Sequence, residues 1–270
     1  MKSKTHSLTK NAWNLNAAIW DSVMGIEGNV FFRQLQLPYI LEYLGWDSSK
    51  NLEGKKVLDL ACGNGILARK LADLGAMVVG IDFSSELIKL AEGHSPLNNK
   101  ISYYVVDLTN QDEINPFMDG SFDIVICNMA LFDISDIEVL AQTLPKIVTL
   151  GGIFVFSLTH PAFNNSSTIK MIEEFDQGKL IQTYSLKIDK YLTIYEQKGI
   201  AIHGQKNPQY YYNRPISYYL KLFFKQGFVL DRFDEPEFIR ADSKSPLSWG
   251  FNFREFPPVM LARMKLLGGE

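Results

Sequence analysis

Hydrophobic positions between residues 55 and 160 follow two alternating patterns. Continuous apolar runs, typical of strands buried on both faces, occupy 56–60, 77–81, 101–106, 122–128 and 153–158. Apolar residues recur at helical spacing over 66–74, 84–91 and 136–148, where Pro145 should bend or shorten the last helix. This alternation predicts an α/β fold with a mostly parallel sheet covered by helices on both faces.

The rest of the chain does not show this alternation of strand-like and helix-like patterns. Residues 1–50 predict an aromatic-rich helical cap, and residues 161–214 form a long insertion with little α/β pattern. The segment 215–270 predicts a closing helix at 217–225 and two closing strands. We therefore expect a single domain with a Rossmann-like, seven-stranded sheet, in which residues 51–160 are the cofactor-binding core.

Composition excludes several classes of protein. The chain has 270 residues, of which 46% are hydrophobic, with 27 basic and 30 acidic residues and a net charge of −3. This balance gives no electrostatic reason to expect a nucleic acid partner. No signal peptide or membrane span is apparent, the two cysteines suggest no disulfide framework, and the histidines lack metal-site spacing. We expect a cytoplasmic protein without a metal or membrane partner, and its oligomeric state is left open.

The segment Val57–Gly65 carries the strongest chemical signal. A buried strand ends there in a turn with two glycines, Gly63 and Gly65, which lets the backbone approach a ligand closely. Asp82 ends the next strand, where a carboxylate can accept hydrogen bonds from both hydroxyls of a ribose. Asp107 follows the third strand and is placed to accept a hydrogen bond from an adenine amino group. These positions predict a nucleoside-containing cofactor at the carboxyl edge of the sheet.

Two cofactor classes fit this outline. The run from Gly63 to Ala68 also satisfies the dinucleotide pattern G-x-G-x-x-A. However, Asp59 would place a carboxylate near the turn, which suits an ammonium group better than a pyrophosphate. The charge pattern therefore favours an amino-acid-bearing ligand over a dinucleotide.

The motifs V-L-D-L-A-C-G-N-G, G-I-D-F-S, V-V-D-L and F-D-I-V-I-C-N-M-A-L-F together resemble class I, Rossmann-type methyltransferases dependent on S-adenosylmethionine. Ala61 departs from the glycine that many members carry. The resemblance implies S-adenosylmethionine as cofactor and S-adenosylhomocysteine as product. The cofactor-binding residues that we expect are Arg33, Asp59, Ala61, Gly63, Asn64, Gly65, Asp82, Phe83, Asp107, Leu108, Asn128 and Met129.

The substrate side is less constrained, because this fold draws it from variable loops. The N-terminal aromatic segment, Thr159-His160-Pro161 and Tyr212-Asn213-Arg214-Pro215 resemble a bacterial subgroup acting on small metabolites and natural products. We expect a water-poor aromatic pocket, although such aromatics commonly just pack a core. The expected substrate-binding residues are Trp20, Phe32, Phe132, Tyr211, Asn213 and Arg214.

His160 is the candidate catalytic side chain. It follows the fifth strand at the carboxyl edge, and an imidazole can accept a proton near neutral pH. The alternative is that it only hydrogen-bonds a loop.

Three functions remain open from the sequence. The leading one is methyl transfer to nitrogen or oxygen of a small metabolite or a peptide-derived natural product. The others are an NAD-dependent oxidoreductase and a cofactor-binding protein that has lost catalysis.

Overall fold

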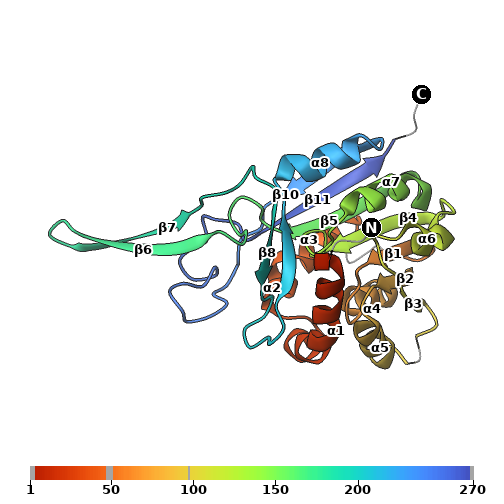
Figure 1. Cartoon of the computed structure of the whole chain (residues 1–270), viewed down its shortest axis with the longest axis horizontal. Helices are drawn as coiled ribbons and strands as arrows, with labels where there is room; N and C mark the ends of the chain where they lie inside the picture. Colours follow the sequence, from red (N-terminus) through yellow and green to blue (C-terminus); the bar gives the residue numbers. More distant parts are fainter. Residues whose placement is uncertain (1–3, 47–50, 97, 268–270) are drawn as a thin grey trace.

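The computed structural model describes residues 4–46, 51–96 and 98–267, and seven strands form its central sheet (Figure 1). Their order across the sheet is β10-β11-β5-β4-β1-β2-β3. Strand β11 runs antiparallel to both of its neighbours, β10 and β5, and all other neighbouring strands pair in parallel. The strands are β1 (Lys56–Leu60), β2 (Met77–Asp82), β3 (Ile101–Val105), β4 (Phe122–Asn128), β5 (Val148–Thr159), β10 (Phe228–Asp234) and β11 (Val259–Leu266). The predicted Rossmann-like fold is confirmed.

Helices cover both faces of this sheet, because alternate residues of the central strands are apolar on each side. Val57 of β1 packs in a cluster with α4, whereas Leu58 packs in the opposite cluster with α7 and α8. The helices on the side of Val57 are α2 (Val30–Leu35), α3 (Leu37–Tyr43) and α4 (Ile66–Asp73). Those on the side of Leu58 are α7 (Ile137–Ile147) and α8 (Ile216–Phe224). Helix α5 (Ser85–Gly93) follows β2, and α6 (Gln111–Ile114) continues into a 3-10 turn at Asn115–Phe117.

Strand β5 is longer than the sequence predicts. It begins at Val148, before the predicted strand at 153–158, and runs through Gly151 and Gly152. Gly151 has φ +77°, and the pairing with β4 shifts register between Phe122 and Ile124. The strand therefore contains an irregularity at this point, because glycine tolerates the left-handed conformation that Gly151 adopts.

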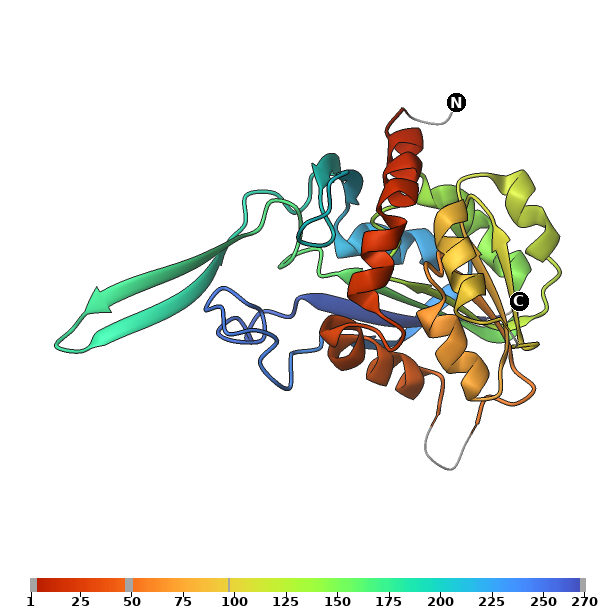
Figure 2. The same ribbon diagram turned by 90° about the horizontal axis from the view of Figure 1, so that it is seen from below.

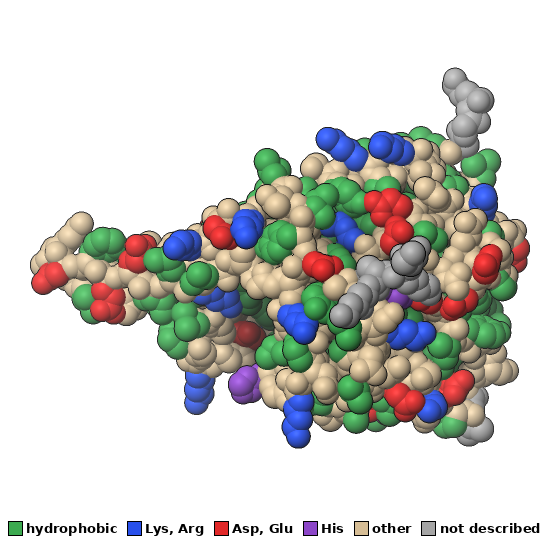
Figure 3. All heavy atoms as spheres, in the orientation of Figure 1, with side chains coloured by type: hydrophobic (Ala, Val, Ile, Leu, Met, Phe, Trp, Pro, Cys, Tyr) green, Lys and Arg blue, Asp and Glu red, His purple; other side chains and the backbone are tan. Residues whose placement is uncertain are grey.

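The insertion after β5 forms two antiparallel hairpins. Strands β6 (Ile169–Asp176) and β7 (Leu180–Lys187) make a long arm that projects from the body of the molecule (Figures 1 and 2). Apolar side chains lie along this arm on the molecular surface (Figure 3). Strands β8 (Tyr195–Gly199) and β9 (Gln209–Asn213) form the second hairpin, which contacts the N-terminal helix α1 (Lys4–Met24).

Candidate active site

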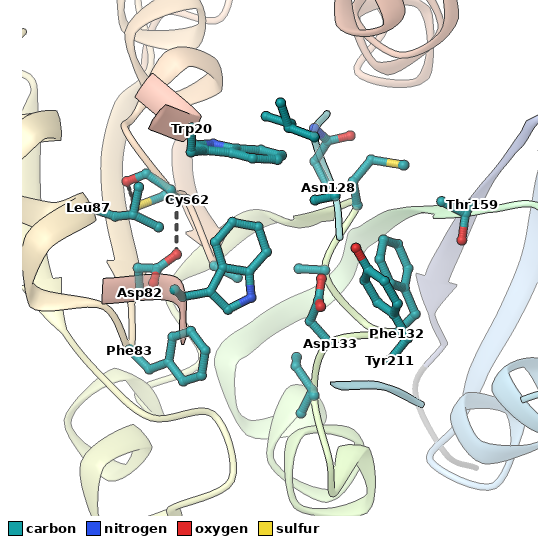
Figure 4. A pocket seen from close by; sticks show the side chains of 18 of the residues that line it. Trp20, Cys62, Asp82, Phe83, Leu87, Asn128, Phe132, Asp133, Thr159 and Tyr211 are labelled. Atoms are coloured by element: carbon teal, nitrogen blue, oxygen red, sulfur yellow. Dashed lines mark hydrogen bonds between the residues drawn. The ribbon is translucent and has the colours of Figure 1, made fainter. Parts of the chain in front are cut away.

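A cavity of about 610 Å³ lies at the carboxyl ends of β1, β2 and β4. The strand order reverses between β1 and β4, which is where ligands bind in open α/β sheets. Residues of α1 and of the β8–β9 hairpin complete its walls (Figure 4). The expected site residues that line it are Trp20, Phe32, Asp59, Ala61, Gly63, Asn64, Asp82, Phe83, Asp107, Leu108, Asn128, Met129, Phe132, Tyr211 and Asn213.

The turn after β1 depends on left-handed backbone at three positions. Gly63 has φ +58° and Gly65 has φ +75°, and a Cβ on Gly65 would lie 2.3 Å from the Tyr103 hydroxyl oxygen. Ala61 has φ +54°, which costs a residue with a Cβ about 1–2 kcal/mol and explains why glycine suits this position. Gly65 itself does not line the cavity in the described part of the chain, so its role is to shape the turn.

Asp82 is buried beside this turn. Its carboxylate, labelled in Figure 4, accepts hydrogen bonds from the backbone N–H groups of Gly63 (3.0 Å) and Ser84 (2.8 Å). Burial raises the pKa of Asp82 to about 6, although the hydrogen bonds from Ser84 and Gly63 oppose this shift. Each carboxylate oxygen retains acceptor capacity, so Asp82 can still bind hydroxyl groups of a ligand.

Asp59 lies deeper, with only 1% of its surface exposed. Its Oδ2 atom is buried and has no hydrogen-bond partner among the residues that the structure describes. Burial, reinforced by the charge of Asp82, raises the pKa of Asp59 to about 8. A buried carboxylate oxygen without a partner is costly, so this position fits a ligand that carries a hydrogen-bond donor or a positive charge.

Asp107 is engaged within the protein. Its Oδ2 atom lies 2.8 Å from Nε2 of His6 in α1, and its Oδ1 atom accepts hydrogen bonds from the backbone N–H and hydroxyl of Thr109. The expected contact of Asp107 with adenine stays a prediction. The bond to His6 ties α1 to the end of β3, an interaction that the sequence pattern did not indicate.

Helix α1 covers the cavity through polar contacts along its length. Asn14 accepts a hydrogen bond from the Ser84 hydroxyl (2.7 Å). Asp21 accepts one from Asn64 (2.7 Å) and lies 2.8 Å from Nε2 of His94. The aromatic side chains of Trp13 and Trp20 pack edge to face with centroids 5.0 Å apart, and both line the cavity. The N-terminal segment therefore forms a wall of the site.

Besides Gly65, three expected site residues lie outside this cavity lining as the structure describes it: Arg33, Arg214 and His160. Arg33 is exposed, and its guanidinium donates to the Gly28 carbonyl oxygen. It therefore caps a local turn and does not line the cavity, and its expected contact with the cofactor stays a prediction.

Arg214 is buried behind the cavity. Its guanidinium donates hydrogen bonds to the carbonyl oxygens of Leu131 (3.3 Å), Ile134 (3.0 Å) and Ser135 (2.7 Å). It holds the loop after β4 in place, which is a different role from the expected contact with substrate.

Both ring nitrogens of His160 are engaged in the protein. Nε2 lies 2.7 Å from a carboxylate oxygen of Glu235, and Nδ1 accepts hydrogen bonds from the backbone N–H groups of Ala162 and Phe163. The ring also stacks on Phe163 with centroids 4.5 Å apart. Burial lowers the pKa of His160, against the opposing effect of Glu235. This placement favours a neutral, structural histidine over a proton acceptor for substrate.

Of the four carboxyl groups that line the cavity as the structure describes it, those of Asp59, Asp82, Asp107 and Asp133, the sequence pattern missed only Asp133. It lies in the loop between β4 and α7, beside Phe132 and Tyr211 (Figure 4). Its position after the apolar β4 strand could have identified it as a site residue from the sequence. It went unused because a lone aspartate before a helix is usually a solvated cap.

Comparison with known proteins identifies the core. A family described as "Methyltransferase domain" matches residues 58–156, which span β1 to β5. Residues 58–156 form a class I methyltransferase domain. The resemblance seen in the sequence motifs is confirmed. In addition, none of the helices in the described part of the chain combines the length and hydropathy needed to cross a membrane.

Known proteins resemble this methyltransferase domain to different extents. The ubiquinone biosynthesis O-methyltransferase of Vibrio atlanticus (strain LGP32) is 33% identical over 132 residues, which are 48% of this chain and 52% of that protein. The Burkholderia vietnamiensis (strain G4 / LMG 22486) enzyme of the same name is 37% identical over 116 residues, 42% of this chain and 49% of that protein. The chain thus spans about half the length of these curated relatives.

A solved structure resembles this chain in fold over more than the matched domain. The S-adenosylmethionine-dependent methyltransferase from Mesorhizobium loti superposes with a TM-score of 0.64 at 22% identity. The superposition covers 89% of this chain and all (100%) of that one. The shared fold therefore includes most of the elements outside residues 58–156.

Proposed function

We propose that this protein transfers a methyl group from S-adenosylmethionine to a nitrogen or oxygen atom of a small molecule. The observation that carries the proposal is the buried, unpartnered Oδ2 atom of Asp59 at the glycine-rich turn of a methyltransferase domain. When bound, S-adenosylmethionine supplies an electrophilic methyl group on a sulfonium sulfur. The residues around the cavity bind this cofactor, orient the acceptor and exclude water.

The cofactor end of the cavity fits the two polar ends of S-adenosylmethionine. Asp59 would pair with the ammonium group of its amino acid part, and Asp82 would accept hydrogen bonds from the ribose hydroxyls. Gly63 would leave room for the amino acid part, since the nearest side-chain atom to a Cβ built there is Nε1 of Trp20 at 3.8 Å. Asp107 and Leu108 would lie at the adenine.

The acceptor end is walled by aromatic side chains. Phe132 and Tyr211 pack with centroids 5.7 Å apart, and Trp20 lies across the cavity from them (Figure 4). Transfer from a sulfonium to a neutral nucleophile disperses charge, which a water-poor environment favours. The acceptor that suits these walls is a small metabolite or natural product with an apolar body.

A dinucleotide fits this cavity less well. Its pyrophosphate would lie at the glycine-rich turn, where Asp59 and Asp82 already place two buried carboxyl groups. A pyrophosphate there would face two acidic groups in place of hydrogen-bond donors, and an ionised carboxylate would repel it strongly in a low-dielectric site. We therefore favour S-adenosylmethionine over NAD, in line with the named activity of the relatives.

Calorimetric titration tests the proposal directly. We expect S-adenosylhomocysteine to bind, and NAD not to bind, the wild-type protein. Asp59→Asn should lower the affinity for S-adenosylhomocysteine by about 10- to 100-fold, which is the loss typical of removing a hydrogen bond to a charged group. The matched control is Asp73→Asn, which removes the same charge at an exposed position of α4. Tight NAD binding without S-adenosylhomocysteine binding would refute the proposal.

A further inference from the structure

The loop between β4 and α7 is held rigidly against the cavity. Arg214 binds three of its carbonyl oxygens from behind. The Phe132 carbonyl accepts a hydrogen bond of 2.7 Å from the Tyr212 backbone N–H in β9, and the Asp133 N–H donates to Ala130 (2.8 Å). Because the loop is fixed on both sides, the Asp133 side chain has a defined position in the cavity wall.

Asp133 presents an unsatisfied carboxylate to this cavity. Its Oδ1 atom is buried and has no hydrogen-bond partner within residues 4–46, 51–96 and 98–267. Burial raises the pKa of Asp133 well above its usual range, the charge of Asp82 adds to this, and a hydrogen bond from the Trp13 side chain opposes it. Figure 4 places Asp133 between the Asp82 side and the Tyr211 side of the cavity. A ligand group that supplies a proton or a positive charge would satisfy the buried atom.

The charges that line the cavity favour a cation. Its described lining has four carboxyl groups, those of Asp59, Asp82, Asp107 and Asp133, but only one lysine, Lys198. Lys198 lies over the Tyr210 ring, with Nζ 5.3 Å from the centroid. Under the proposed function the first three carboxyl groups serve the cofactor, which leaves Asp133 for the second ligand.

The surroundings of Asp133 are those of an ammonium site. Trp13, Phe132 and Tyr211 bring aromatic rings to the same part of the cavity, and their faces attract a cationic group. The Tyr211 hydroxyl oxygen accepts a hydrogen bond of 2.9 Å from the Gln209 side chain, which orients it. A carboxylate combined with aromatic rings distinguishes an amine from a neutral alcohol of equal size.

We infer that the methyl acceptor is a primary or secondary amine with an apolar body, and that Asp133 is the catalytic residue that binds its ammonium group and accepts its proton. This inference rests on the proposed function. In the step, one N–H bond breaks and the proton moves to the Asp133 carboxylate. The nitrogen lone pair then forms the N–CH₃ bond, while the S–CH₃ bond breaks and its electron pair stays on sulfur. The products are a methylated ammonium group, a neutral thioether and a protonated Asp133.

Three probes of similar size separate an amine site from a hydroxyl site: phenethylamine, 4-ethylphenol and tyramine, which carries both groups. Each is titrated against protein saturated with S-adenosylhomocysteine. We expect the two amines to bind and the phenol to bind at least tenfold more weakly. Asp133→Asn should lower the affinity for the two amines by about 10- to 100-fold and leave the affinity for the phenol unchanged. The control Asp73→Asn should leave the affinities for all three probes unchanged.

Affinity for S-adenosylhomocysteine is measured for every variant, so that a folding defect or a failure of the proposed cofactor is seen separately. Asp133→Asn with wild-type affinity for S-adenosylhomocysteine is a folded variant, and its amine affinity then decides the question. Preferential binding of the phenol, no binding of either amine, or an unchanged amine affinity in Asp133→Asn overturns the inference. Transfer of labelled methyl to phenethylamine, lost in Asp133→Asn, would support it further.

Discussion

Asp59 and Asp82 face one cavity from neighbouring strands, and burial together with the charge of Asp82 raises the pKa of Asp59 to about 8. At neutral pH Asp59 is therefore largely protonated in the ligand-free protein. A cationic ligand group favours the ionised form, so its binding must release a proton. This relationship gives the cofactor site a pH dependence that an isolated aspartate would lack.

Affinity for S-adenosylhomocysteine should rise with pH between about 6 and 8. In this window the fraction of ionised Asp59 grows, by at most about tenfold per pH unit. Calorimetry at several pH values, in buffers that differ in ionisation enthalpy, measures both the affinity and the proton released. Asp59→Asn should flatten this rise, whereas Asp73→Asn should keep it. A pH-independent affinity in the wild type would contradict the role of Asp59.

Asp59→Asn should also stabilise the ligand-free protein at alkaline pH. Because the pKa of Asp59 is raised in the folded state, its contribution to stability is full below the unfolded pKa near 3.8 and is lost as pH rises through about 8. The variant avoids this loss. Its melting temperature should exceed that of the wild type increasingly from about pH 4 to pH 8 and by a constant margin above pH 8, with about 2–4 °C for each kcal/mol. A difference that is constant or negative between pH 4 and pH 8 would show that Asp59 is not strained in the folded protein.

His160→Ala should reduce stability more than activity. The substitution removes the partly buried bonds to Glu235 and to the backbone, which costs about 1–3 kcal/mol. Cofactor affinity should stay near that of the wild type, and the rate should fall less than tenfold. His203→Ala, at an exposed position, is the matched control. A 100-fold loss of rate with an unchanged melting temperature would contradict this prediction and indicate that His160 acts as a general base.

The same histidine predicts a loss of stability in acid. Burial lowers the pKa of His160 from its ordinary value near 6.5, so the unfolded chain takes up a proton at higher pH than the folded protein does. The contribution of His160 is therefore present above about pH 6.5 and is lost as pH falls. Denaturant unfolding between pH 7 and pH 5 should show a steeper decline for the wild type than for His160→Ala.

Cofactor should protect α1 and the 200–214 segment from proteolysis. Both wall the cavity, and α1 is held by polar contacts such as those of Asn14 and Asp21. Segments of this kind open more readily than a packed core. Limited digestion with and without saturating S-adenosylhomocysteine measures the difference, and Asp21→Asn should increase the sensitivity of the free protein. Equal digestion rates in both states would contradict this prediction.

Local patterns in the sequence predicted the α/β core and most of the cofactor end of the site. Val57 and Leu58 lie in adjacent positions on opposite faces, so one apolar run revealed a strand buried on both sides. The carboxyl edge of the sheet then brought Asp59 and Asp82 together without further information.

The remaining site residues depend on contacts between distant parts of the chain. His6 meets Asp107 across 101 positions, and Arg214 binds carbonyl groups about 80 positions before it. Arg33 and His160 were assigned by type and proximity to motifs. Arg33 instead binds a nearby carbonyl group, and His160 binds nearby backbone amides and the carboxylate of Glu235, 75 positions away. The hairpin of β6 and β7 pairs polar and apolar residues without a buried face, so its sequence carries little strand signal.

Helix α1 joins the two ends of the cavity in one rigid piece. Near its start, His6 holds the loop after β3, and near its end Asp21 holds the glycine-rich turn through Asn64. Between them, Thr9 accepts a hydrogen bond from the Tyr210 backbone in the hairpin on the acceptor side. Displacing α1 would break all three attachments together. Exchange of the spent cofactor and departure of the methylated product would thus share a single gating event, and its frequency would set an upper limit on turnover.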